Sequence, residues 1–272
     1  MTFPTVLLSK REKMAMRLSV SNQKGGAGKT TTALNVAGAL NELGSEVLLI
    51  DFDPQGHATE GLGFEDLYDD PEQDSLFEVL PDLDRMDDLE DLIVEHQEMD
   101  CVPSHVRMIN AEDELSNVMR REERLDMLLD NVDDEYDFII VDCPPNLGVL
   151  TDNAIVATGH VLIPAQAKST SIRAIELLFQ QLRSMEQAFG DIHEVGLVAN
   201  EVGVDGEADE MMDWFKDVFD DKENCEVFEI RKRVALQRAW NNGVSIFEHE
   251  EDCDMEDVYL DIACHLEEQI DG

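Results

Sequence analysis

The chain has 272 residues, of which 43% are apolar, and this is enough for one α/β domain with a buried core. It carries 62 acidic side chains against 20 of Lys and Arg, which gives a net charge of −42. The acids are spread through periodic apolar segments, which argues against a disordered acidic tail. No apolar run approaches the roughly 20 residues that a membrane-spanning helix needs.

A folded chain this acidic predicts a surface adapted to very high salt, as in halophilic archaea. An acidic protein from ordinary salt is the alternative. At ~1 M salt the Debye length is about 3 Å, so that repulsion between the acids is tolerable. The five cysteines, at positions 101, 143, 225, 253 and 264, form no C-x-x-C pair. They predict reduced thiols in a cytoplasmic protein and argue against a bound metal.

Residues 1–16 are interpreted as an N-terminal extension, with Met14 and Met16 as alternative starts, and residues 17–272 as a single domain. The domain opens with a β-like run at 17–20, a glycine-rich loop at 21–32 and an apolar helix at 33–40. Strand, glycine loop and helix in this order are the context of a phosphate-binding loop. Its expected nucleotide-binding residues are Gly25, Gly26, Ala27, Gly28, Lys29, Thr30 and Thr31. The backbone N–H groups would surround the phosphates, Lys29 would bind them, and the Thr30 hydroxyl would bind Mg²⁺.

The loop departs from the common pattern, because Gln23 stands where the first glycine is expected and Lys24 opens K-G-G-x-G-K-T. A plain helix-capping turn is the alternative interpretation. The pattern resembles the deviant Walker A box of the ParA/MinD superfamily of dimerising ATPases, and the Asn-Gln before it is similar to the ParA branch. The resemblance implies ATP as the nucleotide, a sandwich homodimer, and a Lys24 that touches the phosphates bound by the second subunit.

A buried strand is predicted at 46–51, followed by DFDPQGHATEGLG, which is similar to the DLDPQGNAT box of the ParA family. Asp51 and Asp53 are two residues apart, so both carboxylates point toward the carboxyl edge of the sheet. The resemblance implies that Asp51 holds a metal-bound water and that Asp53 orients the attacking water. Residues 65–98 are expected to form an acidic, solvated insertion with helical pieces at 75–80 and 87–97. A short strand is expected to close at 101–104, before a helix at 115–129 whose arginines pair with acids.

Residues 136–142 are predicted to form a strand that ends in Asp142, the Walker B pattern, which brings a carboxylate to the Mg²⁺. The sequence that follows resembles the switch segment of the same family. Strands at 160–164, 194–200 and 226–230 alternate with helices at 169–189, 206–221 and 255–270. Asn200 ends its strand and, by resemblance, contacts adenine, although asparagine at such a place is also a common turn former. The last helix lacks the basic and bulky apolar faces of a membrane-targeting tail, so that no membrane partner is expected.

This alternation predicts a doubly wound, mostly parallel sheet flanked by helices, of the P-loop NTPase type. A second cluster lies at 230–243, where Arg231, Lys232, Arg233 and Arg238 stand against an acidic background. The stretch is similar in position to IPRNVRLSEAPSHG of relatives, in which basic residues contribute to non-specific DNA binding. Arg231 replaces the proline and Arg238 the glutamate of that pattern. The alternative is that these four residues pair with acids of the protein itself.

Together the boxes indicate a Mg²⁺-dependent ATP hydrolase in which Lys24, Lys29 and Asp53 carry the chemistry and hydrolysis is slow until a partner stimulates it. The resemblance implies a nucleoid-associated protein that segregates plasmid or chromosome DNA with a ParB-like partner. Three alternatives remain open at this stage: an ATPase that positions a protein assembly, a dimeric regulatory scaffold without useful turnover, and an iron–sulfur reductase. The last is disfavoured because no cysteine pair is present.

Overall fold

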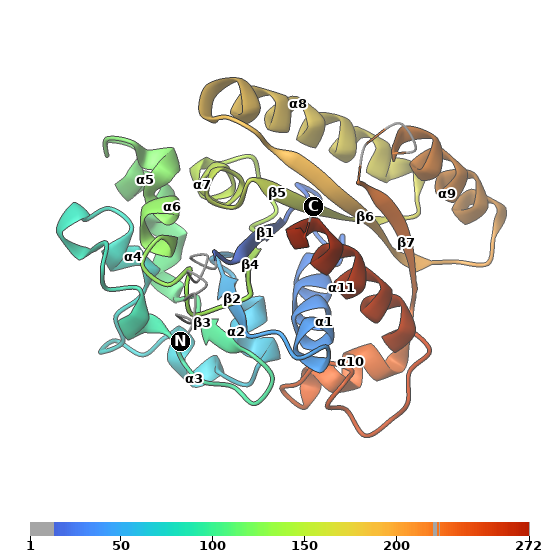
Figure 1. The fold of residues 1–272 in the computed structure, drawn as a ribbon, viewed down its shortest axis with the longest axis horizontal. Helices are drawn as coiled ribbons and strands as arrows, with labels where there is room; N and C mark the ends of the chain where they lie inside the picture. The colour runs from blue at the N-terminus through green and yellow to red at the C-terminus, as the bar shows by residue number, and fades with distance from the viewer. Residues whose placement is uncertain (1–13, 220–221, 223, 272) are drawn as a thin grey trace, which may run out of the picture.

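The structure, a computed structural model, describes residues 14–219, 222 and 224–271. In this part of the chain seven strands form one sheet in the order β3-β2-β4-β1-β5-β6-β7 (Figure 1). All neighbouring strands are parallel, which confirms the predicted doubly wound sheet. The strands are β1 (Met16–Val20), β2 (Val47–Asp51), β3 (Asp100–Val102), β4 (Phe138–Asp142), β5 (His160–Gln166), β6 (His193–Val202) and β7 (Glu226–Arg231). The prediction for residues 1–16 lies largely outside the described residues.

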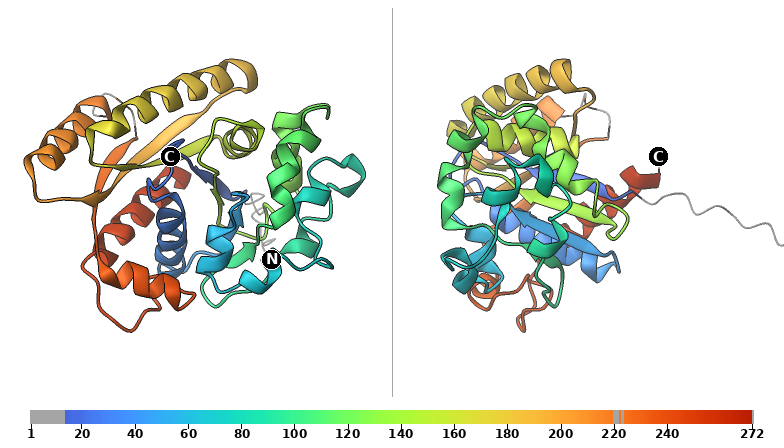
Figure 2. Two further views of the ribbon diagram at one scale, coloured as in Figure 1. Left: turned by 180° about the vertical axis from the view of Figure 1, so that it is seen from behind. Right: turned by 90° about the vertical axis from the view of Figure 1, so that its left-hand side faces the viewer.

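Helices cover both faces of this sheet (Figures 1 and 2). One face packs against α1 (Lys29–Glu42) and α11 (Glu256–Asp271), and the other against α7 (Val149–Thr158), α8 (Ile172–Phe189) and α9 (Gly206–Phe219). The shorter helices are α2 (His57–Gly61), α3 (Glu65–Tyr68), α4 (Leu76–Val79), α5 (Ala111–Leu115), α6 (Arg124–Leu129) and α10 (Val234–Asn241). Five 3-10 turns are also described: η1 (Leu83–Arg85), η2 (Glu90–Leu92), η3 (Val106–Asn110), η4 (Arg121–Glu123) and η5 (Ser169–Ser171). No helix among the described residues is long and apolar enough to cross a membrane.

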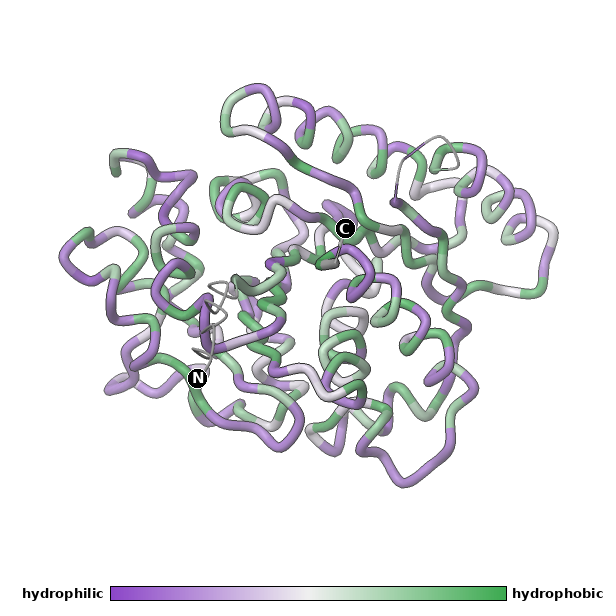
Figure 3. Tube along the Cα trace, in the orientation of Figure 1, coloured by the Kyte–Doolittle hydropathy of each residue, from purple (hydrophilic) through white to green (hydrophobic). Residues whose placement is uncertain are grey.

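The strands are continuous apolar runs because helices cover both faces of the sheet. In β2, Leu49 packs into the core that contains Leu40 of α1, whereas its neighbour Leu48 packs into the core that contains Leu150 of α7. Both strand residues are fully buried. Figure 3 shows the apolar stretches gathered in the sheet and on the inner sides of the helices. A strand buried on both faces has no polar positions to alternate with, so that its sequence is apolar throughout.

The acidic segment at 65–98 is more deeply packed than a solvated insertion would be. Five of its apolar side chains are buried against the β2–β4 part of the sheet, namely Leu76, Val79, Leu80, Leu89 and Leu92. The predicted helix at 87–97 is wrong, because only the 3-10 turn η2 forms there. Val94 instead pairs with Cys101 of β3 in an antiparallel bridge, with backbone N–O distances of 2.8 and 2.9 Å. The unpaired backbone groups of an edge strand favour this extended pairing over a helix.

The predicted helix at 115–129 is also interrupted. Arg120 has a φ of 53°, which ends the preceding turn, and α6 begins only at Arg124. The side-chain oxygen of Asn153, on α7, accepts hydrogen bonds from the backbone N–H groups of Arg124 and Leu125 at 3.0 and 3.1 Å. This cap comes from another helix, and therefore the local sequence does not indicate it. As expected, Arg120 and Arg121 pair with acids, whereas the Arg124 guanidinium donates to the Met119 carbonyl.

Candidate nucleotide site

The glycine-rich loop joins β1 to α1 at the carboxyl edge of the sheet. Gly26 and Gly28 have φ values of 72° and 90°, in the left-handed region that glycine tolerates best. Helix α1 begins at Lys29, which is 7% exposed. The first turn of this helix contains no acidic side chain. Gly28 has no side chain with which to cap the helix. The helix start is therefore available to an anion, and its dipole favours negative charge there.

The front of the loop is fastened to β5 and to α8. Asn22 donates from its side-chain nitrogen to the Pro164 carbonyl at 2.7 Å, and Gln23 donates in the same way to the Ala174 carbonyl at 2.9 Å. Gln23 is therefore an anchor of the loop in the position where a glycine is more common.

The Lys24 ammonium group donates hydrogen bonds to hydroxyl groups of its own chain. Its Nζ donates to the Thr170 hydroxyl at 2.7 Å and to the Ser171 hydroxyl at 3.4 Å, both on η5. Partial burial, with a contribution from Lys168, lowers the pKa of Lys24. A lysine placed in this way has to leave two hydroxyl groups before it can reach a phosphate elsewhere.

Two buried carboxylates stand at the ends of neighbouring strands. Asp51 of β2 and Asp142 of β4 are register partners. One Asp51 oxygen, Oδ2, accepts from the backbone N–H and from the hydroxyl of Thr59, each at 2.7 Å. Neither oxygen of Asp142 has a hydrogen-bond donor among the described residues, although both oxygens are buried.

The electrostatics of this pair favour binding of a divalent cation. Burial raises the pKa of Asp51 to about 7, against the opposing hydrogen bonds from Thr59. Burial is the main cause that raises the pKa of Asp142 well above its usual range, and the nearby Asp51 carboxylate is the second. Thr30 and Lys29 act in the opposite direction and lower this pKa. Carboxylate oxygens are ligands that Mg²⁺ prefers, those of Asp142 have no hydrogen-bond partner among the described residues, and a divalent ion would favour the charged form of both carboxylates. The residues therefore fit a Mg²⁺ ion bound by Thr30, Asp51 and Asp142.

Asp53 follows directly beyond the end of β2 and is 5% exposed. Its backbone N–H donates to Asp51 Oδ1 at 3.3 Å, and its own Oδ1 accepts from the Gln55 backbone N–H at 3.0 Å. The turn is also held by Tyr68, whose hydroxyl donates to the Pro54 carbonyl at 2.7 Å. These contacts fix Asp53 next to Asp51.

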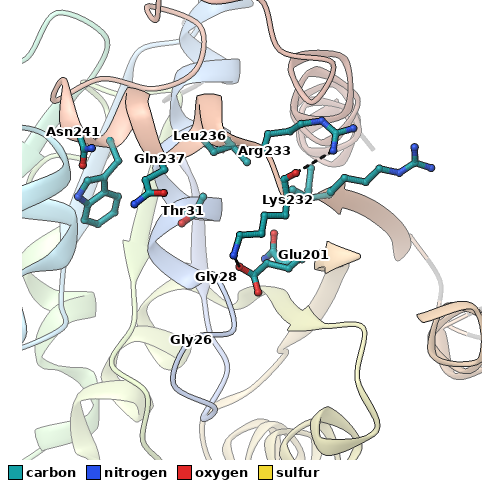
Figure 4. Close-up of a pocket in the computed structure, with 13 residues that line it drawn as sticks. Gly26, Gly28, Thr31, Glu201, Lys232, Arg233, Leu236, Gln237 and Asn241 are labelled. Carbon is teal, nitrogen blue, oxygen red and sulfur yellow. Dashed lines mark hydrogen bonds and ion pairs between the residues drawn. The ribbon is translucent and has the colours of Figure 1, made fainter. Parts of the chain in front are cut away.

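A cavity of about 520 Å³ opens on the other side of the loop (Figure 4). Its wall is made by the loop and α1, by the end of β6, and by β7 with α10. The lining residues are Gly26, Gly28, Thr31, Asn200, Glu201, Ile230, Arg231, Lys232, Arg233, Leu236, Gln237, Trp240 and Asn241. A partly apolar cavity that continues a phosphate-binding loop has the shape and chemistry that a nucleoside requires.

Asn200 is part of this wall, but its amide group is already engaged. Its Nδ2 donates to the Ala27 carbonyl and to the Thr32 hydroxyl, each at 3.1 Å. A Cβ atom on Gly28 would lie 2.5 Å from the same nitrogen, so that only glycine fits opposite Asn200. Because its Nδ2 is bonded to the loop, Asn200 can accept a hydrogen bond from a base only through its Oδ1. The predicted adenine contact would therefore have to be made through that oxygen.

Each of the four predicted DNA-binding residues is paired with an acid. The pairs are Arg231–Glu229 at 2.9 Å, Lys232–Glu201 at 3.4 Å, Arg233–Asp254 at 2.5 Å and Arg238–Glu251 at 2.5 Å. The Lys232 side chain is nevertheless 80% exposed. Three of the four also line the cavity beside the loop. The arrangement therefore matches the alternative interpretation, in which these cations pair with the protein's own acids.

Glu201 is a site residue that the sequence did not reveal. It has a φ of 53° at an irregularity of β6, lines the cavity, and accepts from Gln166 Nε2 at 3.1 Å as well as pairing with Lys232 (Figure 4). The pattern of the strand gave no sign of this backbone turn. Thr59 was missed as well, although it lies in the DFDPQGHAT stretch that was singled out in the sequence, eight residues after Asp51.

A glycine-rich loop and lysine at a helix start, beside three carboxylates at one edge of a parallel sheet, define a P-loop nucleotide-binding α/β protein. Residues 15–193 match a family model described as "AAA domain". The chain is 34% identical over 257 residues to the sporulation initiation inhibitor protein Soj of Bacillus subtilis, which covers 92% of this chain and 97% of that protein. The chain therefore belongs to the ParA/Soj family of partition ATPases, within the ParA/MinD superfamily.

Two further comparisons concern a curated relative and a solved structure. The chain is 40% identical over 172 residues to the chromosome partitioning protein ParA of Myxococcus xanthus, covering 62% of this chain and 59% of that protein. Among solved structures, the ATP complex of a Cyanothece McdA variant superposes with a TM-score of 0.81 at 21% identity, over 94% of this chain and 97% of that one. At that identity the likeness concerns the fold.

Proposed function

We propose that this protein is a Mg²⁺-dependent ATP hydrolase that segregates plasmid or chromosome DNA. The observation that carries the proposal is the meeting of the Lys29 loop with Asp51, Asp53 and the donor-free Asp142 at one edge of the sheet. The backbone N–H groups of Gly25, Gly26, Ala27 and Gly28, with Lys29 and Thr31, hold the phosphates of ATP, whose nucleoside enters the cavity beside Asn200. Thr30 would bind the Mg²⁺ directly, Asp51 and Asp142 would hold it through metal-bound waters, and the ion would supply positive charge beside the phosphates.

In this proposal Asp53 orients the water that attacks the γ-phosphate. Its buried place beside Asp51 supports the role, since a carboxylate has to be held still in order to position a water. Lys24 acts between subunits: it leaves Thr170, touches the phosphates in a second copy of the chain, and thereby makes the ATP-bound state a sandwich homodimer. Hydrolysis then separates the subunits. The intrinsic rate is slow and is raised by a ParB-like or other cargo adaptor.

The same proposal places the protein in the cytoplasm, on the nucleoid, where the ATP dimer binds DNA without sequence preference. Arg231, Lys232, Arg233 and Arg238 supply this contact by exchanging their acidic partners for DNA phosphates. Two copies of the cluster in a dimer strengthen such binding through avidity. Binding falls steeply with salt, because the affinity comes from counterion release.

The test is steady-state ATP hydrolysis by the full chain, with and without DNA and a candidate ParB-like partner, beside the Asp53→Ala variant. We expect slow Mg²⁺-dependent turnover that the partner raises, and no turnover in Asp53→Ala. In light scattering with ATP, Asp53→Ala is expected as a stable dimer. Absence of ATP hydrolysis under all conditions would contradict the proposal, and would favour a regulatory scaffold that binds ATP and dimerises without turnover.

A second candidate keeps the ATPase and changes the cargo to a protein assembly. The pairing of all four basic residues with acids favours it, because each DNA contact would cost an ion pair. DNA retention separates the two candidates: an ATP-bound Asp53→Ala dimer that stays off DNA even at low salt would support the positioning ATPase.

A further inference from the structure

Four buried residues beside the nucleotide loop form a closed ring of hydrogen bonds. The Ser104 hydroxyl, just after β3, donates to the Asp53 carbonyl at 2.7 Å, and the Ser104 backbone N–H donates to the Thr59 hydroxyl at 2.8 Å. Thr59 donates in turn to Asp51 Oδ2 at 2.7 Å, and Asp51 Oδ1 accepts from the Asp53 backbone N–H at 3.3 Å. The ring therefore links the end of β2, the start of α2 and the end of β3.

The ring is well shielded from water. Ser104 is 1% exposed, Thr59 and Asp51 are fully buried, and Asp53 is 5% exposed. Hydrogen bonds in such a place are stronger than in water, and a donor that loses its partner there has no solvent to replace it. The Asp53 carbonyl also accepts from the Gly56 N–H at 2.9 Å, within the turn itself. Ser104 thus holds this turn from the segment that follows β3.

We propose that Ser104 is a positioning residue for ATP hydrolysis, which acts by fixing the main chain of Asp53 relative to Asp51. This inference rests on the proposed function, in which Asp53 orients the attacking water and Asp51 serves the Mg²⁺. Ser104 acts through the Asp53 carbonyl, and its other hydrogen bond leads to Thr59. Its loss should therefore disturb the chemical step and leave ATP binding intact.

The size of the effect follows from geometry. Misplacing a group by about 1 Å at a reacting centre costs on the order of 100-fold in rate. Without the Ser104 hydroxyl, the turn keeps its internal Gly56 contact and its contact to Tyr68, so that the displacement is smaller. We expect kcat to fall roughly 10-fold in Ser104→Ala, with the KM for ATP changed less than about 2-fold.

The experiment measures kcat and KM for ATP, together with thermal melting, in the full chain. Ser19→Ala is the matched control, since Ser19 is also a fully buried serine that donates to a carbonyl, that of His160 at 3.1 Å. We expect Ser19→Ala to melt like Ser104→Ala and to keep the wild-type kcat.

A Ser104→Ala variant with the kcat of Ser19→Ala would overturn the inference and leave the proposed function standing. Wild-type protein without any turnover would overturn both. If Ser104→Ala does not fold, Tyr68→Phe provides the test. This variant removes the hydroxyl that donates to the Pro54 carbonyl, the next carbonyl of the same turn, and Tyr68 is partly exposed. A lowered kcat at constant KM in Tyr68→Phe would support the control of Asp53 through its turn, and an unchanged kcat would refute it.

Discussion

Asp51 and Asp142 lie at the same level of two adjacent parallel strands, so that two fully buried carboxylates share one dry site. This relationship makes the nucleotide-free protein sensitive to pH. The pKa of Asp51 is raised to about 7 by burial, whereas in the unfolded chain it is near the ordinary value of 3.8. The folded protein therefore keeps a proton that the unfolded chain has lost, and the stability that this proton provides disappears as the pH rises through about 7.

We expect Asp51→Asn to remove the part of this pH dependence that Asp51 contributes, whereas Asp142, whose pKa is also raised, keeps its own part. Nucleotide-free Asp51→Asn should melt at a higher temperature than the wild type at pH 8, and the difference should shrink toward pH 5. Melting curves at pH 5, 6, 7 and 8 in one salt concentration test this, with Asp213→Asn on the exposed side of α9 as the matched control. The same variant should lose Mg²⁺-dependent hydrolysis. A constant difference in melting temperature across this range would contradict the argument.

Lys29→Ala should abolish nucleotide binding, because the lysine supplies the positive charge at the helix start. Titration with a fluorescent ATP analogue should show a loss of affinity of at least about 100-fold, consistent with the loss of a charge-assisted contact in a poorly hydrated site. Lys216→Ala, which removes an exposed lysine of α9, serves as the control and should bind like the wild type. Undiminished ATP affinity in Lys29→Ala would sink the assignment of the loop.

Lys24 and Thr170 should have opposite effects on dimerisation. Lys24→Ala should bind ATP and stay a monomer, because the contact to the second subunit is lost. Thr170→Val removes the shorter of the two hydrogen bonds that hold Lys24 on its own chain, and should raise the fraction of dimer several-fold at a given ATP concentration. Light scattering with an unhydrolysed ATP analogue measures both. If Thr170→Val forms less dimer than the wild type, the contact helps assembly and does not restrain it.

The DNA contact can be tested from the acidic side of an ion pair. Arg233 binds Asp254 through two nitrogens, at 2.6 and 2.5 Å, so that Asp254→Asn should free the guanidinium. We expect Asp254→Asn to retain more DNA at low salt and Arg233→Glu to retain less. Each gained or lost phosphate contact should change the slope of log affinity against log salt by about 1.

Arg183→Glu, on α8, makes the same change of charge outside the basic cluster and provides the control for this experiment. If Arg233→Glu and Arg183→Glu weaken DNA retention equally, the effect comes from net charge, and the basic cluster has no special role.

The sequence predicted the parts of this protein that depend on neighbouring residues. The strands were found because each is an apolar run that ends at a turn, and the loop and the carboxylates were found because their spacing places them at one sheet edge. The helix at 87–97 failed because Val94 pairs with Cys101 across the sheet edge, and the one at 115–129 because Asn153 of another helix caps α6. The spacing of residues along the chain carries no record of either contact.

The same limit applies to the site. Asp51, Asp53 and Asp142 could be assigned from their strands, whereas Ser104 meets Asp53 from a position 51 residues further along the chain. Glu201 enters the cavity through a backbone turn to positive φ, which no residue type at that position announces. The pairing of the four basic residues with particular acids also required the folded chain, since acids are available on every side of them.

The bridge between Val94 and Cys101 has a consequence for how this protein behaves when crowded. It pairs part of the outer side of β3, so that this edge strand presents fewer unpaired backbone N–H and C=O groups to another protein molecule. In concentrated salt, screening shortens the reach of electrostatic repulsion to about 3 Å, and charge alone cannot keep molecules apart. Steric protection does not depend on ionic strength, so that the segment before β3 still shields this edge of the sheet in such a solution.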